Sequence, residues 1–330
     1  MRRVIIVAAV LILTAAAGAG GAWIWLADAY ERPGPSDRPV TVIVPKGVAP
    51  AAIAETLKAA GVIADVRIFK WGRRLFAEPK PLRAGEFEFA AAISAAAAVV
   101  HLQSGPTVVR KVTVAEGLTN AEVVDLLNRT PGLSGLPGPL PPEGRLLPET
   151  YHFSYGDSRA QVIARMRVAM AQLLAEAWPA RAENLPLTSL DEALTRASIV
   201  EKETGVAGER PRVAGVFVNR LRKGMRLQSD PTVIYGLTQG AGALGHGLTR
   251  AELDTATPYN TYVVKGLPPT PIANPGRAAV LAVLNPAATK DLYFVADGTG
   301  GHVFAETLKA HLANVAKWRK IERARRNAGQ

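Results

Sequence analysis

An apolar run without a single charge occupies residues 4–27. About 20 helical residues cross the hydrocarbon core of a bilayer, so this run predicts a transmembrane helix. Arg2 and Arg3 precede it, and two tryptophans and a tyrosine lie near its far end like an interfacial aromatic belt. The positive-inside rule then places the N-terminus in the cytoplasm and the rest of the chain outside it. A cleaved signal peptide is the alternative, because the small residues at 17–22 resemble a cleavage region, and the body is exported in either case.

Two short strand–turn–helix patterns follow this run. Residues 29–39 are rich in proline, a composition typical of a tether. Residues 40–61 then alternate branched side chains as a strand, turn, and continue with a helical period. The second copy covers residues 108–128, where Thr119 is expected as an N-cap and Glu122, three residues later, completes a capping box.

The rest of the chain has helical patterns with few strands. Pro and Gly are dense over residues 131–148 and indicate a loop that leads into a larger domain. Helices are expected over 158–178 and 190–204, from Pro211 onward and at the C-terminus, with a late strand over 291–296. Because no regular βαβ alternation is present, the pattern predicts an α+β fold.

The segment at residues 189–205, SLDEALTRASIVEKETG, carries the most chemical information. At 100° per residue, Glu201 falls about 20° from Leu190, inside the apolar stripe. The opposite arc is expected to hold the polar residues Asp191, Glu192, Thr195, Arg196, Ser198, Lys202 and Glu203. A carboxyl group held against apolar surface resists ionisation, the condition for a general acid near neutral pH, so Glu201 is the candidate acid. A structural glutamate paired with Lys or Arg is the alternative.

Two loop segments offer polar and aromatic groups for a ligand. Asp230 precedes Pro231, a turn-initiating pair whose carboxylate either caps a turn or touches substrate. Tyr259 and Asn260 lie in a PYNTY segment at 258–262. Sugar sites use aromatic faces and amides of this kind, and stiff loops use the same residues for packing.

Composition and charge narrow the function classes. The chain has 39 Lys and Arg against 28 Asp and Glu, a formal charge of +11, and without Arg2 and Arg3 the exported part carries +9. On an exported protein this charge favours an anionic membrane or an acidic wall polymer and disfavours nucleic acid. The chain has no Cys, which excludes disulfides and thiolate chemistry. No nucleophile elbow, phosphate loop or zinc helix is present, and the five His have no metal-ligand spacing.

With these segments assembled, the sequence resembles the membrane-anchored endolytic murein transglycosylases of the YceG-like family. The resemblance is densest over residues 143–311. It is carried by Glu143-Gly144 with LLPETYHF (146–153), ASIVEKET (197–204), VFVNRL (216–221), LQSDPTVIY (227–235), PYNTY (258–262), GLPPTPIANPG (266–276) and LYFVADGTGGHVF (292–304), followed by Thr307 and His311. The family more often has Phe, Asp and Gly where Leu147, Glu149 and Thr270 stand.

The resemblance implies a domain order and a reaction. It implies that Glu201 is the catalytic glutamate and that no metal or cofactor is required, with Glu203, Asp230, Tyr259 and Asn260 as substrate-binding candidates. The expected segments are a cytoplasmic tip and transmembrane helix (1–28), a linker (29–39), a LysM-like module (40–105), a second small strand–helix unit and loop (106–142), a catalytic domain (143–315) and a basic C-terminal helix or tail (316–330).

The expected activity is cleavage of the MurNAc–GlcNAc bond in nascent glycan strands to give 1,6-anhydro-MurNAc ends, which terminates elongation. The expected location is the inner membrane, held through residues 4–27, with peptidoglycan strands and glycan-synthesis enzymes as partners. Two alternatives stay open. One is a wall hydrolase that uses water, and the other is a non-enzymatic peptidoglycan-binding scaffold in which Glu201 is structural.

Overall fold

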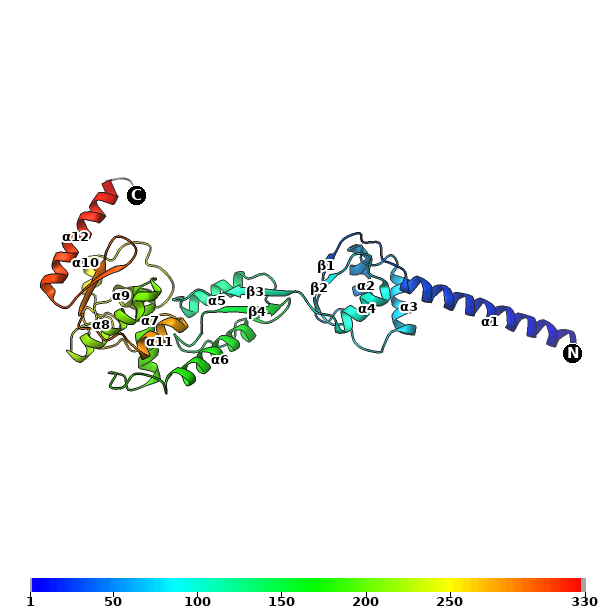
Figure 1. The fold of residues 1–330 in the computed structure, drawn as a ribbon. Helices are drawn as coiled ribbons and strands as arrows, with labels where there is room; N and C mark the ends of the chain where they lie inside the picture. Colours follow the sequence, from blue (N-terminus) through cyan, green and yellow to red (C-terminus); the bar gives the residue numbers. More distant parts are fainter. Residues whose placement is uncertain (1, 328–330) are drawn as a thin grey trace. The chain divides into compact units, whose positions relative to one another are not determined.

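The computed structural model describes residues 2–327, and the chain forms two compact units. Unit 1 runs to Arg110 and also takes in the later segment His152–Asp157. Unit 2 contains Lys111–Tyr151 and the chain from Ser158 onward. Figure 1 shows the order of the helices and strands along the chain.

Unit 1 begins with a long apolar helix, α1 (Arg2–Glu31). Within residues 2–327 it is the one helix long and apolar enough to cross a membrane, and its apolar side chains are exposed. Its last turn packs on the unit, because Tyr30 is buried over Gly72, where a Cβ atom would lie 2.2 Å from the tyrosine ring. The helix fits the predicted single-pass anchor.

The body of unit 1 is a two-stranded antiparallel sheet covered by helices. Strand β1 (Val40–Val44) pairs with β2 (Gly85–Phe89), with Val40 opposite Phe89 and Val44 opposite Gly85. The helices are α2 (Pro50–Ala59), α3 (Val66–Phe76) and α4 (Ala95–Ser104). The predicted strand–turn–helix over 40–61 is confirmed as β1 and α2, while α3 was not predicted. The hydrophobic core of unit 1 contains the buried aromatic residues Phe69, Phe87 and Phe89.

The chain crosses from unit 1 to unit 2 in strand β3 (Val109–Thr113) and returns in β4 (Thr150–Ser154), and these strands pair in a second two-stranded sheet. The returning segment is held within unit 1 by side chains. Lys46 Nζ donates to the Gly156 carbonyl at 2.9 Å, and the Thr107 and Ser154 hydroxyls are 3.1 Å apart.

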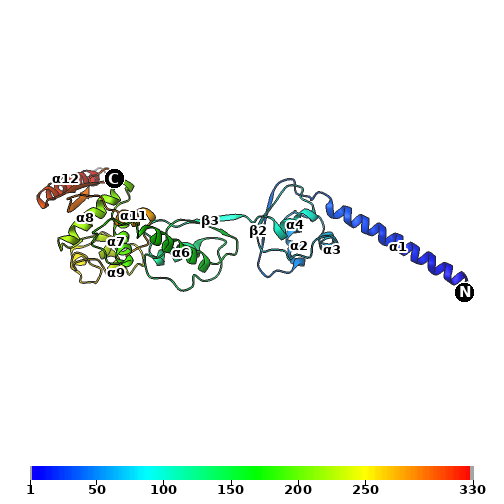
Figure 2. The same cartoon turned by 60° about the horizontal axis from the view of Figure 1, so that its bottom comes forward.

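Unit 2 is mainly helical. It contains α5 (Asn120–Arg129), α6 (Arg159–Ala177), α7 (Leu190–Glu203), a short 3₁₀ turn (Ala207–Glu209), α8 (Arg210–Arg222), α9 (Asp230–Thr238), α10 (Arg250–Asp254) and α11 (Arg277–Leu284). A hairpin of β5 (Tyr293–Ala296) and β6 (His302–Ala305) follows, and α12 (Leu308–Asn327) packs against it. Figure 2 shows α7, α8, α9 and α11 gathered in one part of the unit.

These elements confirm the α+β class and most helices of the larger domain. The capping box of α5 is also confirmed, since Thr119 Oγ1 accepts from the Glu122 N–H and the Glu122 carboxylate accepts from the Thr119 N–H. Asp230 begins helix α9 and does not form an isolated turn.

The predicted polar arc of α7 is wrong for three residues. Thr195, Arg196 and Ser198 are buried, together with every residue from Ala193 to Val200. The reason is that α7 contacts α8, α9 and α11, so this stretch has no face toward water.

Candidate active site

Glu201 lies in the last turn of α7 with its side chain only 4% exposed. One carboxylate oxygen accepts from Arg210 Nη2 at 3.0 Å, and the other accepts from the Gly276 backbone N–H at 2.8 Å. The group therefore meets two donors and not a purely apolar surface. An arginine partner is the feature expected of a structural glutamate, and buried carboxyl groups with a charged partner also occur at functional sites.

A second carboxylate, Glu116, shares the same guanidinium. Glu116 Oε2 accepts from Arg210 Nη2 at 3.1 Å, and its side chain is 42% exposed. Burial and the charge of Glu201 raise the pKa of Glu116, against a smaller lowering by Arg210. Two carboxyl groups and one cation thus form the cluster at Glu201.

Backbone pairing between two distant loops builds this cluster. The Gly117 N–H donates to the Asn274 carbonyl at 3.0 Å, and the Asn274 N–H donates to the Leu118 carbonyl at 2.8 Å. The fully buried Asn274 side chain accepts from the Leu146 N–H and donates to Glu143. These bonds fix the loop that presents the Gly276 N–H beside the loop that carries Glu116.

Glu203 faces a different set of groups. Ser229 Oγ donates to its carboxylate, and burial raises the pKa of Glu203 to about 7, with a further raising by the charge of Asp230. Asp230 is exposed and accepts from Tyr262 Oη at 2.6 Å. The structure therefore brings Glu203 and Asp230 into one neighbourhood, apart from the contacts of Glu201.

Tyr259 and Asn260 are held by their own loop. The Tyr259 hydroxyl is 2.8 Å from that of Thr270, and its ring lies 4.9 Å from the ring of Tyr235. The Asn260 side chain is fully buried and donates to the carbonyls of Leu253 and Thr255. Asn260 thus holds the loop in shape from a buried position.

Unit 2 also contains a cavity of about 590 Å³. Lys202, the neighbour of Glu201, is one of its walls, and Tyr235 is another. Half of the remaining wall is a loop of mainly small residues at 240–246. The other lining residues are Thr119, Glu122, Pro231, Ile234, Thr238 and Ile272. Its volume is in the range that holds a ligand of one to a few rings.

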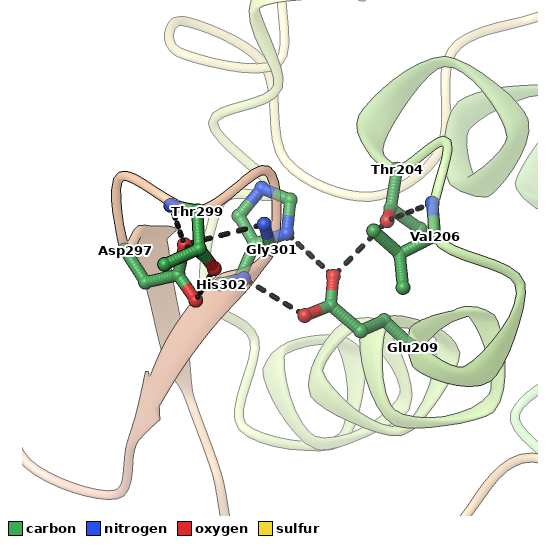
Figure 3. Close-up of polar contacts among 7 residues, drawn as sticks. All are labelled: Thr204, Val206, Glu209, Asp297, Thr299, Gly301 and His302. Atoms are coloured by element: carbon green, nitrogen blue, oxygen red, sulfur yellow. Dashed lines mark hydrogen bonds and ion pairs between the residues drawn. The ribbon is translucent and has the colours of Figure 1, made fainter.

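A third polar cluster fastens the β5–β6 hairpin to the chain between α7 and α8. Figure 3 shows the Glu209 carboxylate between Thr204 and His302. It accepts from the His302 N–H at 2.8 Å, meets the His302 ring Nδ1 at 2.7 Å and accepts from the Thr204 hydroxyl at 3.1 Å. Burial would raise the pKa of Glu209, but the hydrogen bonds from His302 and Thr204 outweigh it, and the net pKa is lowered.

Sequence reasoning missed three groups around Glu201, namely Glu116, Arg210 and the Gly276 N–H. In the sequence, Glu116 directly precedes Gly117, and a glycine at that place is a weak signal of a turn. In the structure, Gly117 has a positive φ of 79°, and a Cβ atom there would lie 3.6 Å from Glu201 Cγ. Among residues 2–327 no group of three or more His, Asp or Glu could hold a metal ion.

Comparison with known proteins relates this chain to a family. The sequence profile described as the YceG-like family matches residues 42–317. The chain belongs to that family. The resemblance drawn from the sequence motifs is therefore confirmed, and the LysM-like character of residues 40–105 stays a prediction.

Two curated relatives of this YceG-like chain are named endolytic murein transglycosylase. The Bacillus subtilis (strain 168) protein is 38% identical over 181 residues, which is 55% of this chain and 48% of that protein. The Streptococcus pneumoniae (serotype 2, strain D39) protein is 29% identical over 331 residues, 86% of this chain and 59% of that protein. The YceG-like chain thus spans about half the length of the first relative and 59% of the second.

A crystal structure of a YceG-like protein from Listeria monocytogenes has a similar fold. It is 31% identical in sequence and superimposes with a TM-score of 0.53. The match covers 84% of this chain and 99% of the other.

Proposed function

We propose that this protein is an endolytic murein transglycosylase that cleaves the MurNAc–GlcNAc bond within peptidoglycan strands. The observation that carries the proposal is the buried Glu201 carboxyl group, which has one guanidinium partner and whose neighbour in sequence, Lys202, lines the cavity. The names of the two curated relatives support the substrate class.

The proposed reaction needs one acid–base group. Protonated Glu201 gives its proton to the oxygen that leaves the anomeric carbon of MurNAc, and the C–O bond breaks. The 6-hydroxyl oxygen of the same sugar bonds to that carbon, and its proton passes to the Glu201 carboxylate. The acid is regenerated, no water is consumed, and the new end is 1,6-anhydro-MurNAc. A hydrolase, in contrast, usually needs a second carboxylate to deliver water or a nucleophile.

Other groups are assigned by position. Tyr235 and Lys202 on the cavity wall are suited to stack on and hydrogen-bond a glycan. Asp230 is exposed and can contact substrate beside its hydrogen bond from Tyr262, while Asn260 and Tyr259 shape the loop. Glu203 is the alternative acid, because a pKa of about 7 suits proton donation at neutral pH.

The apolar helix α1 supports an anchor in the inner membrane, with the N-terminus cytoplasmic and the body facing nascent glycan. From that position, internal cleavage terminates the elongation of strands. Enzymes of glycan synthesis are the partners that this placement favours, and the first small unit, residues 40–105, is proposed to be a LysM-like glycan-binding module.

The test is digestion of purified peptidoglycan by the full chain in detergent micelles, with mass spectrometry of the terminal sugars. Wild type is compared with Glu201→Gln and Glu203→Gln. Anhydro ends that are lost with Glu201→Gln and kept with Glu203→Gln support the reaction and its acid. The reverse pattern moves the acid to Glu203. Reducing ends indicate a hydrolase, and intact glycan with a folded wild type indicates a binding protein.

A further inference from the structure

We infer that Glu116 is a positioning residue for Glu201. By sharing one guanidinium nitrogen with Glu201, it takes up part of the positive charge that faces Glu201 and couples the protonation of the two carboxyl groups. The inference rests on the proposed function for its meaning in catalysis, but it concerns the electrostatics of the free protein and is tested there.

Both carboxyl groups contact the same nitrogen atom, Arg210 Nη2. Arg210 Nη2 is 3.0 Å from Glu201 Oε1 and 3.1 Å from Glu116 Oε2. The Arg210 side chain is 9% exposed, and its Nε has no hydrogen-bond partner among the described residues. The guanidinium is therefore divided between two anions and does not pair with Glu201 alone.

Sharing one guanidinium makes it less favourable for both carboxyl groups to be ionised at the same time. A lone Arg partner and the Gly276 N–H would strongly favour the carboxylate form of Glu201, which is the wrong form for a general acid. A second carboxylate on the same cation repels the first and draws away part of its partner. Two groups coupled in this way titrate as a pair, and one of them keeps its proton to a higher pH.

The remaining charges near the pair do not replace Glu116. Lys202, on the same helix, directs its ammonium to the Gly117 carbonyl at 3.3 Å. Arg277, the first residue of α11, is exposed, and α8 contributes Arg210 itself. Of the charged groups that the described elements bring here, Glu116 is the anion that contacts the guanidinium together with Glu201.

The backbone leaves room for this carboxylate. A Cβ atom on Gly276 would lie 1.8 Å from Glu116 Oε1, so any side chain at that position would displace it. The same glycine donates its N–H to Glu201. Because Gly276 has no side chain, its N–H can donate to Glu201 while the Glu116 carboxylate passes close to it and reaches Arg210. The Glu116 side chain is also 42% exposed and so contacts solvent, whereas the Glu201 side chain is 4% exposed.

The experiment is a carbon-13 NMR titration of the full chain in micelles, labelled at the glutamate side-chain carboxyl. Glu201→Gln and Glu116→Gln assign the two signals. In wild type, we expect both signals to move at each of two titration steps. In Glu116→Gln, which removes the negative charge and leaves Arg210 to Glu201, the Glu201 midpoint should fall by about one pH unit. Glu116→Asp keeps the charge and should keep the midpoint near wild type.

Activity gives the second readout. The high-pH limb of kcat/KM should move to lower pH in Glu116→Gln, with about tenfold lower activity at pH 7.5 and near wild-type activity in acid. Glu149→Gln, the same change at an exposed position, is the matched control.

Several results would overturn the inference. Independent one-step titrations of the two assigned signals in wild type contradict the coupling. An unchanged Glu201 midpoint in folded Glu116→Gln contradicts it as well, and so does an activity loss that is equal at all pH values. Absence of anhydro ends with wild type counts against the proposed function, while the NMR titration still decides the role of Glu116.

Discussion

Glu203 is a carboxyl group that the fold makes harder to ionise. Burial, and then the charge of Asp230, raise its pKa to about 7 against the hydrogen bond from Ser229. A carboxyl group whose folded pKa is raised contributes stability below its unfolded pKa, and loses it as pH rises through the folded value. The ionised form of Glu203 therefore weakens the protein above neutral pH.

We predict that Glu203→Gln raises the free energy of unfolding at pH 8 by on the order of 2 kcal/mol, because the amide stays neutral and still accepts from Ser229. At pH 4.5 the variant and wild type should be equally stable. Thermal unfolding at the two pH values checks this. A variant that is less stable than wild type at pH 8 would contradict the prediction.

The opposite sign applies to Glu209, whose pKa is lowered by its hydrogen bonds from His302 and Thr204 in spite of burial. The stability it contributes is present above the unfolded pKa and is lost as pH falls through the folded pKa. Glu209→Gln should therefore lower the melting temperature at pH 7, and the difference should vanish in acid. Glu306→Gln, at an exposed position that follows the same hairpin, is the control and should show no difference at either pH.

At the scale of elements, the hydrophobic pattern predicted the helices well and their surroundings poorly. The helical periodicity of residues 190–203 predicted that α7 has one buried side and one exposed side. In the structure, Arg196 and Ser198 are as buried as Leu194, because helices contact α7 on several sides. A single helix carries no information about how many neighbours cover it. The N-caps were predictable because capping depends on residues only three positions apart.

The same limit explains the site. The Glu201 position was predicted from periodicity and resemblance, but its partners Arg210, Glu116 and Gly276 come from separate segments of the chain. The backbone pairing of Gly117 and Leu118 with Asn274 brings two of these segments together. Pattern within one element cannot reveal a pairing of two loops.

The N-cap of α5 links helix stability to the cavity. Thr119 Oγ1 accepts from Glu122 and also donates to the buried Gly240 carbonyl at 2.7 Å, on the loop that lines the cavity. Thr119→Ala removes both bonds and should lower the free energy of unfolding by about 1–2 kcal/mol. It should also raise KM for glycan more than it lowers kcat, since the loop loses its attachment.

Chemical denaturation and steady-state kinetics measure these two effects. Thr249→Ala is the matched control, because Thr249 caps the short helix α10 with the same capping box but is exposed. The prediction is wrong if Thr249→Ala destabilises the protein as much as Thr119→Ala does.

At the scale of the whole molecule, the absence of Cys gives a direct test of topology. We predict that Leu136→Cys, at a site 85% exposed in unit 2, reacts with a membrane-impermeant maleimide in intact spheroplasts. A Cys inserted directly after the first Met should react only after lysis. Labelling of both sites only after lysis would refute the proposed orientation, and loss of the N-terminal probe from the mature protein would indicate a cleaved signal peptide.

The return of residues 152–157 to unit 1 sets an order for biogenesis. Lys46 and Thr107 bond to Gly156 and Ser154, which are made only after the chain has already passed through β3 and α5. A chain emerging from a translocon therefore cannot complete its first unit until part of its second has followed. A fragment cut at residue 110 would lack this closing segment, so unit 1 and unit 2 are successive in sequence but not independent in assembly.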